Sequence, residues 1–598
     1  MATGPPDQGP PLYVLGINAD QADVSAALLA DGEPVAAIEE ERLNRVKHSR
    51  GFPELAVRRC LELAGIEGRE VDHVALAGNP RTNVVRRSQV ALRARPTPRY
   101  VLRRLRNAAA PPSGLRARIA DALGVELAGL PPLHRIEHHP AHLASAFLVS
   151  PFPAAALCSA DGFGDFVSTT VGRGEGTAID VLLRVPHPHS LGLLYTAVTQ
   201  LLGFGEHGDE YKVMGLAAHG EPRFAAALDP VVEVQPSGDF RLDLSYFERS
   251  TAWYRPAAGT RDPRAPRLRT LFSPRLEELL GPARAPGDPL GERHADVAAS
   301  LQLVFERALL AVLRAAGART GLTALCAAGG CFMNSVLNGK IRAETSFEEV
   351  FVQPAAGDNG LALGAALALS CGALGGTRSY VMEHAYLGPG YGEAEIEAAL
   401  AGLPLDGLDV HRHEDEARLC RAAAALIADG LVVGWFQGRM EWGSRALGNR
   451  SILADPRRAD MRERLNERIK RREAFRPFAP SVLEQAAADF FEDAAPDPFM
   501  MRVVRVREGK RDVVPAVVHV DGTARPHTVD ARTNPRFYAL IRAFEELTRV
   551  PMVLNTSLNE SEPIVETPAQ ALDCFRRTGM DAIVLGRTLV RRRSTAGP

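Results

Sequence analysis

Short apolar runs alternate with longer amphipathic runs along most of the chain. The segment that begins at Leu12 reads as two strands joined by a polar turn, and a segment of the same plan begins at Ala155. Short apolar runs bounded by Gly, Asp and Asn are typical of strands, whereas longer periodic runs are typical of helices. Their alternation predicts an α/β fold. The repeated hairpin indicates two related subdomains in the N-terminal part of the chain.

Two further segments run from a predicted strand through a small-residue turn into a predicted helix. They begin at Leu322 and Phe351, and the first contains Gly329, Gly330 and Asn334. Such a turn presents free backbone N–H groups at a helix start, which suits a phosphate or a nucleotide. The alternative is an ordinary tight turn of an α/β fold, and for either turn taken alone we favour that alternative.

The regular alternation weakens between residues 372 and 392. Because a chain of 598 residues is too long for one hydrophobic core, we place a domain boundary here. We expect one unit over residues 1–385 and a second over residues 386–598. In the second unit we expect a helix from Glu414 to Ala428, followed by a strand and an arginine-rich loop.

The composition argues against several classes of function. The formal net charge of -2 gives no overall attraction to nucleic acid or to acidic membranes. The start of the chain lacks the basic and apolar regions of a secretory signal, and the seven cysteines form no C-x-x-C pair. The most membrane-like stretch, from Gly360, is short and rich in Gly and Ala, which favours a buried helix. We therefore expect a cytoplasmic protein that binds no membrane.

Basic residues are unevenly distributed. Between Asp72 and Asp121 there is no acidic residue, and arginines crowd residues 81–118. This stretch could meet nucleic acid or a phosphorylated ligand, but we favour a solvated insertion in an arginine-biased protein. Lysine is rare by comparison, and Lys47 and Lys212 lie in motif-like stretches. A retained lysine hints at a site that needs a compact positive charge.

Three histidines stand within five residues in the sequence HHPAH. If a helix begins near His138, then His138 and His142 share one face and His139 points elsewhere. Such a pair can bind a metal, although alone it is more often structural. Asp161, at a predicted strand end, and Asp358, at a predicted helix start, are the candidate further ligands. Two imidazoles with carboxylates would suit Fe²⁺ or Mn²⁺ better than a structural Zn²⁺.

Further motifs run in order along nearly the whole chain: ADGFGDF from Ala160, GDEYKVMGLAAHG from Gly208, GGCFMNSVLNGKI from Gly329, PAAGDNGLALGAAL from Pro354, GRMEWGSRALGNRSILADPR from Gly438, RREAFRPFAPSVL from Arg471, HVDGTARPHTV from His519 and NTSLNESEPIV from Asn555. Together with the histidine motif, this set resembles the bacterial O-carbamoyltransferases, which include enzymes that carbamoylate nodulation factors, cephamycin and nebramycin. The antibiotic-tailoring members are the most similar in kind.

The resemblance implies an N-terminal domain of the actin-like ATPase superfamily, similar to the tRNA threonylcarbamoyl transferases, and a C-terminal YrdC-like domain. It implies that carbamoyl phosphate and ATP, with Mg²⁺, form carbamoyl adenylate in the C-terminal domain. The carbamoyl group would then pass to a hydroxyl of a small-molecule natural product in the N-terminal domain. The implied ligands of Fe²⁺ or Mn²⁺ there are His138, His142, Asp161 and Asp358. The acceptor is not readable from the sequence, and a homodimer stays an open option.

A site that handles ATP and carbamoyl phosphate must be cationic, because both carry many negative oxygens. Arginine can bind a phosphate or a carbonyl through paired hydrogen bonds, and Asn555 and Asn559 offer amide groups to the carbamoyl group or the base. A solvated arginine-rich surface is the alternative for some of the basic residues. The basic candidates are Lys212, Arg439, Arg445, Arg450, Lys470, Arg471, Arg476 and Arg525.

The hairpin after the first predicted strand departs from the family pattern. Family members usually carry a His directly before the residue that corresponds to Asp23, whereas this chain has Ala22, which cannot act as a base. Candidate substitutes are His48, beside Lys47, and His139. The main alternative is a nucleotide-binding or adenylate-forming regulator that has lost transfer. A role in tRNA modification is a third option, which the order of the C-terminal motifs disfavours.

Overall fold

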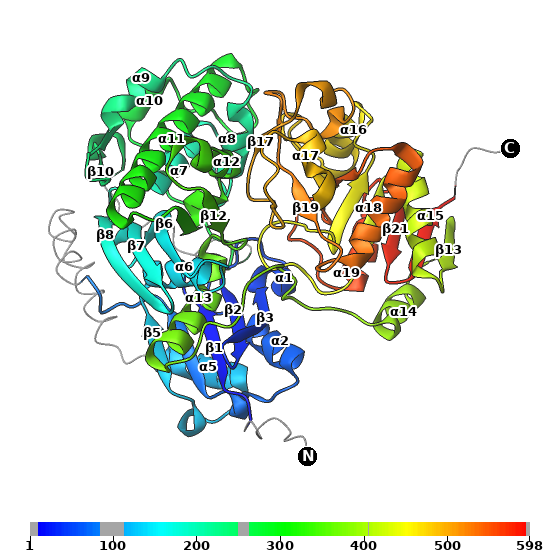
Figure 1. Cartoon of the computed structure of the whole chain (residues 1–598), viewed down its shortest axis with the longest axis horizontal. Helices are drawn as coiled ribbons and strands as arrows, with labels where there is room; N and C mark the ends of the chain where they lie inside the picture. Colours follow the sequence, from blue (N-terminus) through cyan, green and yellow to red (C-terminus); the bar gives the residue numbers. More distant parts are fainter. Residues whose placement is uncertain (1–9, 84–112, 249–261, 263, 405, 594–598) are drawn as a thin grey trace.

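The computed structural model of the protein describes residues 10–83, 113–248, 262, 264–404 and 406–593. Two α/β units lie side by side, the N-terminal unit in blue to green and the C-terminal unit in yellow to red (Figure 1). Residues 374–392, which form no helix or strand, join the two units. The predicted α/β class is confirmed.

Two five-stranded sheets of the same topology build the N-terminal unit. In each sheet three antiparallel strands are followed by two strands that run parallel to the first, which gives the order 3-2-1-4-5 twice. This duplication confirms the two related subdomains and the actin-like architecture expected from the sequence. The strands are β1 (Tyr13–Asn18), β2 (Ser25–Ala30), β3 (Glu33–Glu39), β4 (His73–Ala77) and β5 (Leu133–Ile136) in the first sheet, and β6 (Ala154–Gly164), β7 (Val167–Glu175), β8 (Ala178–Pro186), β11 (Ala324–Ala328) and β12 (Glu349–Val352) in the second.

Helices α6 (His138–Phe147) and α13 (Leu361–Ala368) pack against each other between the two sheets, with α13 on β1 and α6 on β6 and β11. The backbones of α6 and α13 lie so close together that position 364 requires glycine, because a Cβ on Gly364 would lie 1.9 Å from the carbonyl oxygen of Ala141. The expected buried helix after Gly360 is therefore α13. Like every other helix of the described residues, it is not long and apolar enough to cross a membrane.

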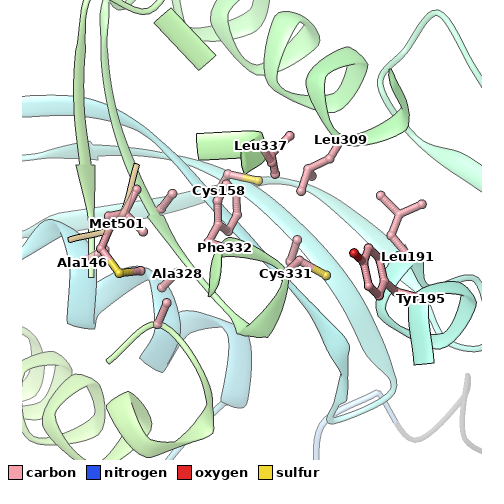
Figure 2. Close-up of a cluster of buried hydrophobic side chains, with 14 of the residues drawn as sticks. Ala146, Cys158, Leu191, Tyr195, Leu309, Ala328, Cys331, Phe332, Leu337 and Met501 are labelled. Carbon is pink, nitrogen blue, oxygen red and sulfur yellow. The ribbon is translucent and has the colours of Figure 1, made fainter. Parts of the chain in front are cut away.

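Helices cover the outer faces of both sheets. Behind the second sheet, Phe332 is fully buried near Cys158 and Leu337, and Met501 of the C-terminal unit reaches the same core beside Ala146 (Figure 2). The side chain of Phe332 thus anchors the glycine turn that precedes it. The helices are α1 (Glu40–Asn44), α2 (Glu54–Ala64) and α5 (Ser113–Leu123) on the first sheet, and α7 (Leu191–Leu201), α8 (Glu210–Ala217), α11 (Glu292–Thr320) and α12 (Ser335–Glu344) on the second.

The C-terminal unit is a mixed sheet of eight strands with its own hydrophobic core, and it corresponds to the expected YrdC-like domain. Helix α15 (Glu416–Ala428) begins at Glu416 because the side chain of Asp415 accepts a hydrogen bond from the backbone N–H of Ala417. It packs against α18 (Pro535–Thr548), and α19 (Pro568–Arg577) packs on β14 and β21. In spatial order the strands are β13 (Leu408–Arg412), β22 (Thr588–Arg592), β21 (Ala582–Leu585), β14 (Val433–Phe436), β15 (Arg450–Ala454), β20 (Met552–Ser557), β16 (Ala479–Leu483) and β19 (His527–Val529).

Hydrogen bonds join the N-terminal and C-terminal units at several places, among them Ser335 and Gly443. The backbone N–H of Val503 donates to the carbonyl of Ser335 at the start of α12, at 2.9 Å. In the glycine-rich loop between β14 and β15, the N–H of Gly443 donates to Glu39 Oε1, at 2.9 Å, and its carbonyl accepts from Arg42, at 2.8 Å. Segments that follow the first and second sheets are therefore both tied to the C-terminal unit.

Candidate functional site

Four side chains, which we name the α6 cluster, converge between the sheets of the N-terminal unit. His138 and His142 lie one turn apart on α6, Asp161 lies in β6, and Asp358 begins the turn before α13. Nε2 of His142 lies 3.1 Å from Oδ2 of Asp161 and 3.6 Å from Oδ1 of Asp358. Nε2 of His138 lies 3.5 Å and 3.6 Å from the same two oxygens. The structure thus brings together the four side chains that the sequence analysis names as ligands.

The electrostatics of the α6 cluster favour a bound cation. Both imidazoles are buried, and Nδ1 and Nε2 of His138, Nδ1 of His142 and Oδ1 of Asp358 have no hydrogen-bond partner within the described part of the chain. Burial alone would raise the pKa of Asp161, but the two imidazoles hold it well below its ordinary value. Burial, and then the charge of Asp161, raises the pKa of Asp358 well above its ordinary value. Two carboxylates and two imidazoles in this arrangement suit a divalent ion.

His139 is separated from the α6 cluster. Its Nδ1 lies 2.7 Å from Ser159 Oγ, and its Nε2 lies 3.0 Å from the carbonyl oxygen of Val167. Burial, and then the neighbouring imidazoles, lowers the pKa of His139 well below its ordinary value. Both ring nitrogens are engaged in the core, so we correct His139 from a candidate base to a structural residue. Gly164 leaves room for the ring of His138, since a Cβ there would lie 2.0 Å from it.

A second group, which we name the hairpin cluster, consists of Asp23, His48 and His207. Nδ1 of His48 lies 2.7 Å from Oδ1 of Asp23, and Nε2 of His207 lies 3.5 Å from Oδ2 of Asp23. The amide of Asn18 connects the two clusters, because its Nδ2 donates to the carbonyls of Asp23, at 3.1 Å, and Asp358, at 2.9 Å. The sequence analysis named His48 but missed His207, although His207 directly precedes the GDEYKVMGLAAHG motif.

Two arginines of the C-terminal unit stand out because Asp497, the acidic residue whose charge acts on both, forms its ion pair with Arg502 instead. Arg445 and Arg525 are partly buried, their Nε atoms are enclosed without a hydrogen bond, and among the described residues neither forms an ion pair. Desolvation, and then the charge of Arg525, holds the pKa of Arg445 well below its ordinary value. Desolvation lowers the pKa of Arg525 to about 10. A guanidinium whose pKa is lowered by desolvation and by a neighbouring guanidinium suits an anionic ligand.

The predicted Lys470, Asn555 and Asn559 lie near the end of β20. Nζ of Lys470 donates to the carbonyl of Ser557 at 2.6 Å and to Oδ1 of Asn559 at 2.7 Å, and burial lowers the pKa of Lys470 well below its ordinary value. Lys470 therefore shapes this loop. Asn555 donates through Nδ2 to the carbonyl of Ala446 at 3.0 Å, and its buried Oδ1 has no partner among the described residues. Of the three, Asn555 retains an acceptor that a ligand could use.

Arg439 and Arg450 differ from the sequence-based prediction. Arg439 donates to the carbonyls of Val35 and Gly388, each at 2.9 Å, which ties the two units together. Arg450 is fully buried and donates to the carbonyl of Gln437, at 2.6 Å, and to other backbone carbonyls of the loop. Because backbone oxygens accept hydrogen bonds from Nε and Nη2 of Arg439 and from both terminal nitrogens of Arg450, the structure favours a structural role for both arginines over the predicted role as anion ligands.

Three further predicted cations already have carboxylate partners. Lys212 lies 2.8 Å from Asp209, and Arg471 is exposed and lies 3.3 Å from Glu560. Nη1 of Arg476 lies 3.4 Å from Glu473, whose other oxygen is 3.8 Å from Lys212. Glu473 therefore bridges the two units here. Of the eight predicted basic residues, only Arg445 and Arg525 are thus left, within the described residues, with a partly buried charge that forms no ion pair and has no set of carbonyls around it.

The predicted glycine turn lies at the α6 cluster, and its last residue, Met333, accepts a hydrogen bond from Arg445 at 3.4 Å. Gly329 has φ 95°, and a Cβ there would lie 2.2 Å from the carbonyl oxygen of Ala160, while a Cβ on Gly330 would lie 3.0 Å from Asp161 Oδ1. Asn334 caps α12, its side chain accepting from the N–H of Leu337 at 3.0 Å. The turn therefore positions Asp161, and its glycines are needed for close packing.

The remaining residues predicted from the sequence, Lys47 and the arginine-rich stretch, form no hydrogen bond or ion pair with either cluster or with the paired arginines in the described part of the chain. Lys47 is exposed, with Nζ 5.9 Å from the ring centre of Tyr211. Most of the arginine-rich stretch 81–118 lies outside the described residues, which omit 84–112. At its end, the guanidinium of Arg118 lies 4.9 Å from the ring centre of Phe52.

The duplicated sheets, the α6 cluster and the paired arginines define a two-domain α/β protein with a cation-type site in one unit and an anion-type site in the other. The chain belongs to the carbamoyltransferase family: residues 13–367 match the family model described as carbamoyltransferase N-terminus, and residues 424–592 match the carbamoyltransferase C-terminus. This result confirms the family resemblance found in the sequence.

Several proteins are similar to this chain over most of its length. The nodulation protein NolNO of Sinorhizobium fredii is 39% identical over 591 residues, covering 96% of this chain and 80% of that protein. The nodulation protein NolO of Bradyrhizobium diazoefficiens is 41% identical over 472 residues, covering 77% and 79%. Among solved structures, component A of the (R)-2-hydroxyglutaryl-CoA dehydratase of Acidaminococcus fermentans covers 61% of this chain and 99% of its own at 14% identity, with a TM-score of 0.31. A similarity of that size carries no functional argument.

Proposed function

We propose that the protein is an O-carbamoyltransferase that uses carbamoyl phosphate and ATP. In this proposal the C-terminal unit forms carbamoyl adenylate, and the N-terminal unit transfers the carbamoyl group to a hydroxyl of a small-molecule natural product, as in antibiotic tailoring. The reaction takes place in the cytoplasm, in keeping with the free cysteines. Membership of the carbamoyltransferase family supports the group that is transferred.

The observation that carries the proposal is the pair Arg445 and Arg525. A partly buried guanidinium that no ion pair neutralises costs folding free energy, so its retention is best explained by a ligand that supplies negative charge. Phosphate and carbamoyl oxygens accept the paired hydrogen bonds that arginine offers. The free Oδ1 of Asn555 could accept a hydrogen bond from the carbamoyl NH₂. ATP enters with Mg²⁺, which is usually held by phosphates and few protein ligands.

The α6 cluster fits the metal that the family resemblance implies. His138, His142, Asp161 and Asp358 would hold Fe²⁺ or Mn²⁺, since they provide two imidazoles and two carboxylates with unpartnered atoms directed at one another. A bound divalent ion would supply a Lewis acid for the charge that develops on the carbamoyl oxygen. The residues of the cluster themselves exclude bulk water, because both histidines are buried.

Product analysis tests the proposal. The protein, loaded with Mn²⁺ or anaerobically with Fe²⁺, is incubated with ATP, Mg²⁺ and radiolabelled carbamoyl phosphate, with and without hydroxyl-bearing acceptors. We expect pyrophosphate release that requires carbamoyl phosphate, together with AMP and a carbamoylated acceptor. Pyrophosphate release with no carbamoylated product from any acceptor would favour the adenylate-forming regulator. ATP turnover at the same rate with and without carbamoyl phosphate would rule out both functions.

A further inference from the structure

The hairpin cluster collects side chains from three separate segments of the N-terminal unit. Asp23 lies in the turn between β1 and β2, His48 in the loop after α1, and His207 in the loop before α8. Asp23 contacts one imidazole through each carboxylate oxygen, at 2.7 Å for His48 and 3.5 Å for His207. The rings of His48 and His207 meet edge to face with centres 5.1 Å apart. The carboxylate therefore orients two imidazoles at once.

Backbone contacts hold this arrangement in place. The N–H of Val24 donates to the carbonyl of Ser49 at 3.2 Å, and the N–H of His48 donates to Glu41 Oε2 at 2.7 Å. Asp23 and His48 both adopt the left-handed conformation, with φ of 54° and 53°. Non-glycine residues in this region are uncommon and persist where the surroundings impose them, often at functional sites. The sequence-distant loops are thus locked so that His48 meets Asp23.

The cluster is a direct neighbour of the proposed transfer site. The buried side chain of Asn18 donates to the carbonyls of Asp23 and Asp358 from the same Nδ2 atom. Ser25 Oγ, on the residue that pairs with Asn18 across β1 and β2, donates to the carbonyl of Asn359 at 2.7 Å. The hairpin that carries Asp23 is therefore fixed against the segment that carries Asp358.

We propose that His48 is the base that accepts the proton of the acceptor hydroxyl, with Asp23 and His207 as its positioning residues. This inference rests on the proposed carbamoyl transfer. It also explains how transfer could proceed although Ala22 replaces the family histidine, since the imidazole comes from the loop after α1 instead of the residue before Asp23. His139 cannot take this role, because both of its nitrogens are engaged in the core.

The geometry suits proton abstraction by Nε2 of His48. The contact with Asp23 assigns the ring proton to Nδ1, which leaves the lone pair on Nε2. Nε2 faces Gly208, where a Cβ would lie only 2.4 Å away, so glycine keeps this nitrogen uncovered. As the acceptor oxygen bonds to the carbamoyl carbon, its proton moves to Nε2. The bond from that carbon to the phosphate oxygen breaks, and AMP leaves with the electron pair.

The charged groups around His48 set the direction of its pH dependence. Burial alone would lower the pKa of His48, but the charge and hydrogen bond of Asp23, and then Glu41, raise it above the ordinary value of 6.5, against the smaller opposing effect of Lys47. His207 faces the same carboxylate from the other side. A base must be neutral to accept a proton, so transfer should increase as the pH rises through a value above 6.5.

The test separates adenylate formation from transfer in the Mn²⁺-loaded enzyme. Carbamoyl-phosphate-dependent ATP–pyrophosphate exchange reports the first step, and radiolabelled carbamate ester formed with an excess of glycerol reports the second. His48→Gln should lower ester formation about 10²–10⁴-fold, while exchange stays within about threefold of wild type. Asp23→Asn should lower the pKa seen in the pH profile of ester formation, an effect that a purely structural role does not produce. His134→Gln, in β5, is the matched control and should match wild type in both assays.

Other outcomes would overturn either the role of His48 as the base or the proposed carbamoyl transfer itself, and the two assays distinguish these cases. Ester formation by His48→Gln at the wild-type rate removes His48 as the base, and so does an Asp23→Asn profile with an unchanged pKa. A second equivalent of bound Mn²⁺ that disappears in Asp23→Asn would show that the hairpin cluster holds an ion instead. Wild-type protein that shows exchange but forms no glycerol ester would also count against a transfer base here. Absence of exchange in the wild type would instead remove the proposed function itself.

Discussion

Nε2 of His142 lies 3.1 Å from Oδ2 of Asp161, although the two residues are 19 positions apart and belong to a helix and a strand. The contact exists because α6 packs on β6 and directs His138 and His142, one turn apart, toward Asp161. Asp358 reaches the same point from the second half of the unit through the turn before α13. The cluster therefore forms only when the two sheets and both helices are assembled.

Metal content gives the first prediction. Wild-type protein loaded with Mn²⁺ should hold about one ion per chain at the α6 cluster, and His142→Ala should lose nearly all of it, because a buried ligand is removed. Inductively coupled plasma mass spectrometry measures the ion, and a lower Tm in chelator confirms that it is bound to the folded state. His139→Gln is the matched control on the same helix. It should keep the ion, while its Tm falls because Ser159 and Val167 lose a buried partner. Equal metal loss in both variants would contradict the ligand assignment.

The second prediction concerns Arg525. Arg525→Met should leave the Tm of the ligand-free protein unchanged or higher, since it removes a partly buried, desolvated charge that forms no ion pair within the described residues. Carbamoyl phosphate at about 100 times its Kd should stabilise the wild type by about 2.7 kcal/mol and the variant by close to nothing. Differential scanning fluorimetry with and without carbamoyl phosphate measures both effects. Arg532→Met, at an exposed position, is the control and should keep the ligand-induced shift.

The sequence allowed the fold and the α6 cluster to be predicted for physical reasons. Strand periodicity and turn residues are local, so the two hairpins could be recognised without their neighbours. His138 and His142 share a helix face, which spacing alone determines. The two aspartates were chosen by their place at predicted element ends and by the family resemblance. The glycine turn at Gly329 was predicted as a possible phosphate site, but its close contact is with Ala160 of the adjacent strand.

The roles of the arginines and of His207 could not be read in the same way. Arg445 lies in the glycine-rich loop and Arg450 at the start of β15, yet both terminal nitrogens of Arg450 donate to carbonyls, whereas the one hydrogen bond of Arg445 within the described residues goes to the carbonyl of Met333, at 3.4 Å. That difference depends on which backbone oxygens surround each guanidinium after folding. His207 meets Asp23 across 184 positions of sequence, a contact that no local pattern encodes.

The third prediction follows from this contrast between buried arginines. Arg450→Met should destabilise the protein by about 3 kcal/mol, because several buried carbonyls, among them those of Gln437 and Pro389, lose their donor. The same substitution at Arg525 should have no such effect, so the pair tests the two roles with one chemical change. Thermal unfolding without ligand provides the comparison. A Tm for Arg450→Met that equals that of Arg525→Met would reject the structural role of Arg450.

The fourth prediction concerns the pH dependence of stability. Burial raises the pKa of Glu40 to about 7, even though Glu40 accepts hydrogen bonds from the N–H groups of Ala56 and Leu55 at the start of α2. The folded state therefore binds more protons than the unfolded state between pH about 4.5 and about 7, and stability falls as the pH rises through this range. Glu40→Gln keeps an acceptor oxygen but removes the charge. The free energy of unfolding of Glu40→Gln should exceed that of the wild type only slightly at pH 5, and by close to about 3 kcal/mol at pH 8. Tm values of both proteins at the two pH values measure it, with Glu62→Gln, at an exposed position of α2, as control. An advantage of the same size at pH 5 and pH 8 would show that Glu40 does not titrate in this range.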